Sequence, residues 1–156
     1  MPTATVLERT LLSTDAAATR DLAARLAVVA RPGDVLSLVG ELGAGKTQFA
    51  KGFGAGLGVT ATIVSPSFVL MAEYVGRLPL FHLDLYRLAD ATDAYAGGLI
   101  DERQGSGVTL IEWAERIEDV LPAARLDVRI EGSGDDPRQI ILRTAHQAFR
   151  RYLDAA

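Results

Sequence analysis

Residues 40–47, Gly-Glu-Leu-Gly-Ala-Gly-Lys-Thr, constrain the fold more than any other part of the chain. They match the pattern G-x-x-x-x-G-K-[ST] at every defined position. The apolar run at 35–39 precedes them and is typical of a buried strand, and the residues from Thr47 to Phe53 are typical of a helix. A strand, a glycine-rich turn and a helix in this order predict a phosphate-binding loop.

The residue types of this loop suit a nucleotide bound together with magnesium. The glycines allow successive backbone N–H groups to turn toward an anion, which the positive end of the following helix also attracts. Lys46 can reach the β- and γ-phosphates, and the Thr47 hydroxyl can coordinate a Mg²⁺ ion on the same oxygens. The residues expected to contact the nucleotide are Glu41, Leu42, Gly43, Ala44, Gly45, Lys46 and Thr47.

Basic residues elsewhere in the chain are nearly all arginine. Of the 16 Lys and Arg residues, only Lys46 and Lys51 are lysines. An ammonium is a compact point charge, whereas a guanidinium is a broad planar donor, so the two are not interchangeable at a phosphate. The use of lysine at position 46 therefore supports the phosphate-binding interpretation.

Composition narrows the class of protein further. The net charge of −4 argues against a free-standing nucleic-acid binder, so a nucleic acid is expected to arrive with a partner. Cysteine is absent, which excludes disulfides and Cys-based metal sites. Asparagine is also absent, which excludes the N-K-x-D pattern of guanine recognition and makes ATP the expected nucleotide. With no signal segment and no apolar run near the roughly 18 residues of a membrane span, we expect one cytoplasmic ATPase domain over residues 1–156.

Hydrophobic periodicity and turn signals predict an α/β protein with a three-layer, P-loop NTPase-like fold. Its sheet should be mixed and mostly parallel, with inserted antiparallel hairpins. Strands are expected at 5–12, 35–39, 68–75, 80–85, 108–111, 126–130 and 139–142, with hairpins formed by 68–75 with 80–85 and by 126–130 with 139–142. Helices are expected from a cap at Ser13 or Thr14 through Val29, from Thr47 to a C-cap at Gly58, from Ala114 to Leu121, and around Phe149, Tyr152 and Leu153, with a short helix and loop at 89–98.

Two acidic residues lie where catalysis could use them. Glu112 ends an apolar strand, and ligands of open α/β sheets bind outside the carboxyl ends of the strands, so Glu112 is a candidate for magnesium or its waters. The alternative is an exposed acid at a helix N-terminus. Asp84 lies two residues after His82, on the same strand face, and could orient or deprotonate the attacking water or hold a magnesium-bound water. The alternative there is an internal pair of Asp84 with Arg87 or His82.

Ser65 and Ser67 flank a proline in a segment that could contact the γ-phosphate, as switch loops do. Two serines around a proline are also typical of a simple turn. Trp113, directly after Glu112, could be a core residue or an exposed contact, and its spacing does not decide between them.

Four segments together resemble the TsaE family, the small ATPase of bacterial tRNA threonylcarbamoyladenosine synthesis. They are the loop 40–47, Ser-Pro-Ser-Phe at 65–68, His-Leu-Asp-Leu-Tyr-Arg-Leu at 82–88 and Leu-Ile-Glu-Trp at 110–113, in the family's order and spacing across roughly residues 35–122. Glu41 replaces a usual Asp, Gln48 a common Thr, and Ser67 a usual Thr whose methyl would stiffen the rotamer. None of these changes removes a required group.

The resemblance implies an ATPase that works with a heterodimeric threonylcarbamoyl transferase complex of TsaB and TsaD type proteins. The partners would hold the tRNA and perform the transfer to the adenosine beside the anticodon, and ATP hydrolysis would reset the complex. By match with the family, Lys46 and Thr47 would hold phosphate and Mg²⁺, Glu112 the Mg²⁺, Asp84 the hydrolytic site and Ser67 the switch loop. Arg138 resembles a nucleotide-contacting arginine of the family.

Two other functions use the same loop. A small-molecule kinase would transfer the γ-phosphoryl group to an acceptor held by arginines such as Arg77 or Arg103, but the chain has no recognisable Arg-rich lid to exclude water. A nucleotide-gated interaction module would bind ATP without hydrolysing it, and Asp84 and Glu112 would then be structural. Dependence of ATP turnover on a small hydroxyl compound would indicate the kinase, and a lack of phosphate release in single-turnover assays would indicate the module.

Overall fold

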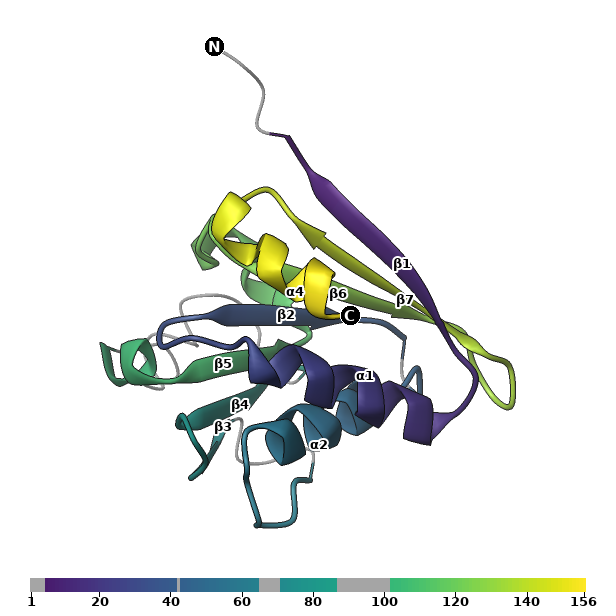
Figure 1. Ribbon diagram of the computed structural model, residues 1–156, viewed down its shortest axis with the longest axis horizontal. Coiled ribbons are helices and arrows are strands. Elements are labelled where there is room, and N and C mark those ends of the chain that lie inside the picture. The colour runs from purple at the N-terminus through teal and green to yellow at the C-terminus, as the bar shows by residue number, and fades with distance from the viewer. Residues whose placement is uncertain (1–4, 42, 65–70, 87–101) are drawn as a thin grey trace.

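A mixed sheet of seven strands forms the centre of the described residues (Figure 1). The computed structural model describes residues 5–41, 43–64, 71–86 and 102–156. The strand order across the sheet is β1-β7-β6-β2-β5-β4-β3. The strands are β1 (Leu7–Ser13), β2 (Val35–Val39), β3 (Met71–Tyr74), β4 (Leu80–Asp84), β5 (Val108–Glu112), β6 (Leu126–Glu131) and β7 (Arg138–Thr144).

The centre of the sheet is parallel and its two edges are antiparallel. Strands β6, β2, β5 and β4 run side by side in one direction. Strand β3 pairs antiparallel with β4, and β7 pairs antiparallel with β6, so both expected hairpins are confirmed. Strand β1 pairs antiparallel with β7 and thus runs in the direction of the central strands. The prediction of a mixed sheet is confirmed, with three parallel and three antiparallel pairings between neighbouring strands.

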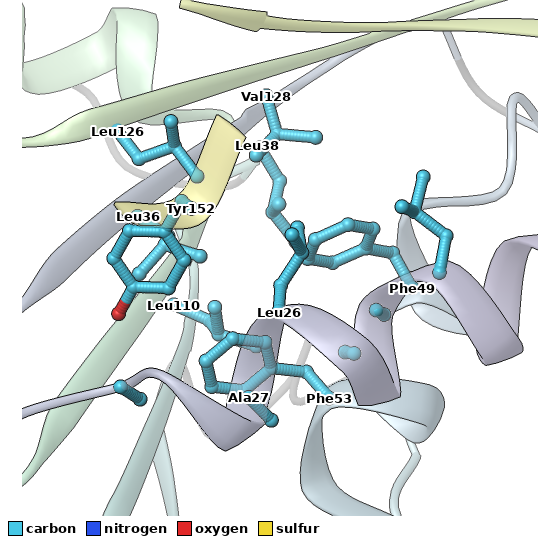
Figure 2. Packing of buried hydrophobic residues seen from close by; sticks show 14 of the residues in the cluster. Leu26, Ala27, Leu36, Leu38, Phe49, Phe53, Leu110, Leu126, Val128 and Tyr152 are labelled. Atoms are coloured by element: carbon cyan, nitrogen blue, oxygen red, sulfur yellow. The ribbon is translucent and has the colours of Figure 1, made fainter. Parts of the chain in front are cut away.

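Three helices, α1 (Ala16–Val28), α2 (Lys46–Gly56) and α4 (Arg150–Ala155), pack on one face of the sheet (Figure 1). The main core lies between them and the strands, and Figure 2 shows α1 and α2 side chains directed at the central strands. Alternate residues of each strand enter this core, because side chains of a strand point to opposite faces in turn. The labelled core residues are Leu26, Ala27, Leu36, Leu38, Phe49, Phe53, Leu110, Leu126, Val128 and Tyr152.

The second face of the sheet divides into an apolar half and a charged half. Over β4 and β5, a smaller apolar cluster packs under the 3₁₀ segment η2 (Ala114–Val120) and includes Phe81, Leu83 and Ile111. Over β6, β7 and β1, the outward side chains include Asp127, Arg143 and Glu8, and with η2 they bound an open hollow of about 700 Å³. Within the described residues, the third layer therefore covers only part of this face.

Glycines bring α1 and α2 unusually close together. A Cβ atom on Gly52 would lie 2.2 Å from the backbone oxygen of Arg20, and one on Gly56 would lie 2.5 Å from that of Ala24. Glycine inside a helix lowers its propensity, so α2 accepts a local cost for this contact. The helix that follows the glycine-rich loop is thereby packed directly against α1.

Two local predictions differ from the structure. The N-cap of α1 is Asp15, whose Oδ1 accepts from Ala18 N at 2.8 Å; Ser13 is still in β1 and its hydroxyl contacts Thr19 instead. The helix expected from Ala114 to Leu121 is the 3₁₀ segment η2, interrupted at Ile117 with φ −129° and ψ 29°. Trp113 offers no side-chain oxygen to cap a regular helix there, and burial of Ile117 against the sheet fixes the irregular backbone.

The remaining elements follow the sequence closely. The C-cap of α2 is Leu57, one residue before the Gly58 that the sequence predicted, and Gly58 follows it with φ +80°. Phe149 ends the 3₁₀ turn η3 (Gln147–Phe149) that leads into α4, and η1 (Glu102–Ser106) precedes β5. The expected short helix and loop at 89–98 lie outside the described residues. So do residues 68–70, the first three of the strand expected at 68–75. Within the described ranges, no helix combines the length and apolar character that a bilayer span requires.

Candidate active site

Three strand ends bring the predicted site together at one edge of the sheet. Strand β2 leads directly into residues 40–47, β5 ends at Glu112 and β4 ends at Asp84. In the register of the parallel strands, Glu112 lies opposite Leu38 on one side and opposite Asp84 on the other. The two carboxylates, far apart in sequence, are therefore neighbours beside the loop.

The loop adopts a shape that its glycines permit. Gly43 and Gly45 have φ of +80° and +113°, the left-handed region that L side chains disfavour. A Cβ atom at Gly40 would lie 2.6 Å from the backbone oxygen of Ile130, whereas one at Gly43 or Gly45 would meet nothing within 4 Å. The loop thus presses on β6 at its start and is open on the side of the later glycines, as a phosphate cradle requires.

Lys46 bends back over this loop. Its Nζ donates to the backbone oxygens of Gly40 at 2.5 Å and of Glu41 at 3.1 Å, and lies 4.4 Å from the centroid of the Trp113 ring. Burial lowers the pKa of Lys46, and the carboxylates of Glu112, Glu115, Asp84 and Glu41 act in the opposite direction. The Lys46 side chain is buried, and its ammonium is stabilised by the negative charge of nearby carboxylates.

Trp113 joins β5 to η2 in a strained conformation. It is the one non-glycine residue with positive φ, 59°, among the described residues. Its ring packs against Tyr86, with centroids 5.0 Å apart, and takes the Lys46 ammonium on its face. Strain of this kind persists where surrounding contacts enforce it, and it gathers at functional sites.

The site contains two buried carboxylates and a buried imidazole. The exposed fractions are 4% for Asp84, 3% for Glu112 and 0% for His82. His82 Nε2 and Glu112 Oε2 are 2.6 Å apart, so the partner of His82 is Glu112 and not Asp84 as one sequence alternative supposed. Asp84 Oδ1 accepts from the Tyr86 backbone N–H at 3.0 Å. The alternative pair of Asp84 with Arg87 falls outside the described residues.

Arg138, at the start of β7, lies against the loop. Its Nε donates to Ala44 O at 2.9 Å and its Nη2 to Gly43 O at 3.2 Å. The sequence expectation was a contact with nucleotide, and in this structure the guanidinium holds the carbonyl side of the loop that the nucleotide would occupy. Leu42, Ser65 and Ser67, also predicted for the site, lie outside the described residues.

The residues present fit a magnesium ion. Mg²⁺ prefers oxygen ligands and is usually held by one or two protein groups together with phosphates and waters. Thr47 is the second residue of α2 and is half-buried, and Glu112 ends the neighbouring strand. Oε2 of Glu112 is engaged by His82, which leaves Oε1 as the carboxylate oxygen for a metal or its water.

The arginines considered for a kinase lie elsewhere. Arg77 precedes β4 and donates to Ala27 O at 2.9 Å and Ala30 O at 3.2 Å, at the C-terminal end of α1. Arg103 is in η1, before β5. Both therefore come at the opposite end of the parallel strands from Asp84 and Glu112.

Comparison with known proteins gives one consistent result. Residues 13–140 match the family model described as threonylcarbamoyl adenosine biosynthesis protein TsaE. The chain is 49% identical over 123 residues to the tRNA threonylcarbamoyladenosine biosynthesis protein TsaE of Bacillus subtilis, covering 78% of this chain and 77% of that protein. The protein of the same description from Treponema pallidum is 44% identical over 108 residues, covering 69% and 80%.

The fold has a solved counterpart. The crystal structure of Bacillus subtilis YdiB superimposes with a TM-score of 0.80 at 38% sequence identity, covering 96% of this chain and 94% of that one. The agreement extends beyond the phosphate-binding loop to the whole arrangement of strands and helices.

Proposed function

The chain belongs to the TsaE family of threonylcarbamoyl adenosine biosynthesis proteins, and from this premise we propose that it is a Mg²⁺-dependent ATPase of tRNA threonylcarbamoyladenosine formation. The observation that carries the proposal is the meeting of Lys46, Asp84 and Glu112 at the carboxyl edge of β2, β4 and β5. A phosphate-binding loop with two buried carboxylates beside it provides the parts that phosphoryl transfer to water needs.

Each residue has a specific task in this proposal. The backbone N–H groups of residues 43–47 bind the phosphates, and Lys46 exchanges its two carbonyl partners for phosphate oxygens. Thr47 and Glu112 hold the magnesium ion, which would neutralise charge on the β- and γ-phosphate oxygens. Asp84 accepts a hydrogen bond from the attacking water and orients it in line with the leaving group. Arg138 keeps the loop in shape and Ser67 contacts the γ-phosphate side.

The proposal extends to partners and compartment. A single ATPase domain acts with a two-protein transferase complex of TsaB and TsaD type, in the cytoplasm, and resets that complex after each cycle. The tRNA is held by the partners, in keeping with the net charge of −4 on this chain. The small-molecule kinase loses support because Arg77 is engaged with the end of α1, away from the carboxylates.

Asp84→Asn tests the hydrolytic role. The amide keeps the size of the side chain and removes the carboxylate, so the ATP dissociation constant should stay within several-fold while phosphate release falls by at least about 100-fold. Asp21→Asn, an exposed change of the same kind on α1, is the matched control and should behave as wild type.

A cellular measurement connects this activity to tRNA. In bacteria depleted of their own TsaE, the wild-type chain and Asp21→Asn should restore threonylcarbamoyladenosine in digested tRNA, as measured by mass spectrometry, and Asp84→Asn should not. Wild-type phosphate release by Asp84→Asn would return Asp84 to a structural role. Restoration of the modified nucleoside by Asp84→Asn without hydrolysis would instead indicate the nucleotide-gated module.

A further inference from the structure

His82 is a fully buried polar residue to which the proposed reaction assigns no task. It lies in the middle of β4, on the face that carries Leu80 and Asp84, and its exposure is 0%. Its imidazole makes one hydrogen bond, between Nε2 and Glu112 Oε2 at 2.6 Å. In the described part of the chain, Nδ1 has no hydrogen-bond partner although it is buried. Burial of a polar ring with one unpaired nitrogen costs free energy. The hydrogen bond to Glu112 is therefore the interaction in which a role for the buried imidazole is to be sought.

The unpaired nitrogen identifies which tautomer occupies this position. A neutral imidazole has one N–H donor and one acceptor nitrogen, whereas a carboxylate only accepts. A hydrogen on Nδ1 would be a buried donor without an acceptor, and Nε2 would then face Glu112 lone pair to lone pair. The tautomer with its hydrogen on Nε2 avoids both problems and donates to Glu112 Oε2.

This donor restrains a flexible side chain. Glutamate has three rotatable side-chain bonds and loses much freedom when it is held in place. The imidazole has only two, and its ring is fully buried on a strand that pairs with β5. A rigid donor that holds one oxygen of a carboxylate is the arrangement by which outer residues orient metal ligands.

We propose that His82 is a positioning residue that holds Oε2 of Glu112 and so presents Oε1 to the magnesium ion or to its water. This inference rests on the proposed function, because it takes Glu112 as the magnesium-linked carboxylate. It adds a requirement that the proposed function lacks: a hydrogen-bond donor at the position of Nε2. A histidine that only filled space in β4 would carry no such requirement.

Two substitutions of His82 separate donation from space-filling. His82→Gln can place its amide nitrogen where Nε2 lies, and His82→Leu fills the space without a donor. With a non-hydrolysable ATP analogue in calorimetry, His82→Leu should raise the Mg²⁺ concentration for half-maximal tightening of binding by about 10- to 100-fold. Its affinity for the analogue in the presence of a chelator should stay within about twofold, and His82→Gln should stay within about threefold in both measurements.

Control variants distinguish failure of this inference from failure of the proposed function. Thr109→Val removes the other buried side-chain atom without a partner among the described residues, on the neighbouring strand and opposite face, and should leave the Mg²⁺ dependence unchanged. Glu112→Gln should raise the Mg²⁺ concentration for half-maximal tightening of binding at least as much as His82→Leu does. If Glu112→Gln has no effect, the metal role of Glu112 and this inference fall together. If Glu112→Gln has the effect and folded His82→Leu has none, only this inference is overturned.

A spectroscopic measurement reads the tautomer directly, without metal or activity. The chain contains two histidines, and His146 is exposed, so ¹⁵N-histidine correlation spectra give two ring systems that His82→Gln assigns at once. The His82 ring should show its hydrogen on Nε2, and Glu112→Gln should shift that signal while leaving His146 unchanged. A hydrogen on Nδ1, or an equal loss of Mg²⁺ dependence in His82→Gln and His82→Leu, would overturn the proposal.

Discussion

Lys46 donates to two backbone carbonyl oxygens of its own loop. The phosphate oxygens of a bound nucleotide would compete with these carbonyl oxygens for the Lys46 ammonium. In the proposed function the exchange would favour the nucleotide, because a charge-assisted bond to phosphate is stronger than one to a neutral carbonyl. The Trp113 ring would stabilise the ammonium before and after such an exchange, since a cation on an aromatic face needs no fixed hydrogen-bond direction.

Removal of this ammonium should abolish tight ATP binding without unfolding the chain. Lys46→Ala loses a charge-assisted contact of about 1.5–3 kcal/mol, equivalent to roughly a 10- to 150-fold weaker dissociation constant in calorimetry. Lys51→Ala, which changes the one other lysine and lies on the same helix, is the matched control and should bind as wild type. An unchanged dissociation constant for Lys46→Ala, with intact circular dichroism, would remove the phosphate-cradle assignment.

At the residue level, the sequence predicted groups that act through local spacing and missed those that act across the sheet. The loop could be placed because all its parts lie within eight consecutive residues, Glu112 because it ends an apolar strand, and Asp84 because it shares a strand face with His82. The bond from His82 to Glu112 depends on β4 lying beside β5, which is a property of strand order. Arg138 was named from the family resemblance, but its bond to Ala44 O likewise depends on the fold, which brings the two together across 94 residues.

Among the helices, α1 and α2 depend on a close contact that tolerates no added atom. Gly52→Ala should raise helix propensity by about 1 kcal/mol, yet it places a methyl 2.2 Å from a backbone oxygen of Arg20. Because overpacking costs typically about 1–3 kcal/mol and backbone cannot yield as a side chain does, we expect net destabilisation in urea unfolding. Gly105→Ala is the control, since its Cβ would meet nothing within 4 Å and its φ is not positive. Equal stability of the two variants would contradict the close packing of the helices.

The C-terminal helix is fastened to the turn before β2. Tyr152 and Arg151 of α4 both donate to Oδ2 of Asp34, which also accepts from the Arg31 backbone N–H at 2.9 Å. Burial, the hydrogen bond to Asp34 and the charge of Asp34 raise the pKa of Tyr152 above its ordinary value. The contact therefore has a pH-dependent contribution to stability.

Tyr152→Phe should reveal that contribution. Below about pH 10 the phenol keeps its proton in both folded and unfolded chains, so the variant should be less stable by about 1.5–3 kcal/mol. At higher pH the unfolded wild type ionises while the fold still requires the proton, so wild-type stability falls and the difference shrinks. Urea unfolding at pH 8 and near pH 11 measures this, with Tyr74→Phe as the control. A difference that grows with pH would contradict the assignment.

Element prediction failed where packing decided the backbone. The strands and α2 followed their patterns, since apolar runs and the loop motif are local signals. Residues 114–121 also have a helical pattern. The segment follows Trp113, whose backbone is left-handed, and its Ile117 packs in the apolar cluster against the sheet, where the backbone leaves helical geometry. The Lys46 and Tyr86 contacts that hold Trp113 come from other strands' ends, so no local window contains them.

Considered as a whole, the described part of the molecule places the two carboxylates and the loop together at the carboxyl ends of the central strands. The site has no second domain of its own to cover it in the described residues, and water exclusion and positioning supply most of the catalysis of phosphoryl transfer. We therefore expect slow ATP hydrolysis by the isolated chain and faster hydrolysis when the two-protein transferase complex is added.

Trp113→Ala should weaken that stimulation more than it weakens ATP binding, because the variant keeps the loop but loses the ring that joins Lys46, Tyr86 and η2. Steady-state phosphate release with and without partners, and calorimetry on the same samples, give the two quantities. Trp113→Phe keeps a ring and should retain most of the stimulation. Equal turnover with and without partners, at concentrations where a complex is shown to form, would refute the expectation.

Strands β1 and β7 pair although roughly 130 residues separate them in the chain. During synthesis this pair can form only after almost the whole chain has been made. At about 5–20 residues per second, β1 leaves the ribosome roughly 7–26 s before β7 can meet it. During that time Leu7 and Leu11 have no neighbouring strand, because β7 and the β6 strand that it pairs with have not yet been made. The β1 edge is therefore the last part of the sheet to close, and a ribosome that stalls before β7 would release a chain whose β1 is unpaired and whose Leu7 and Leu11 are uncovered.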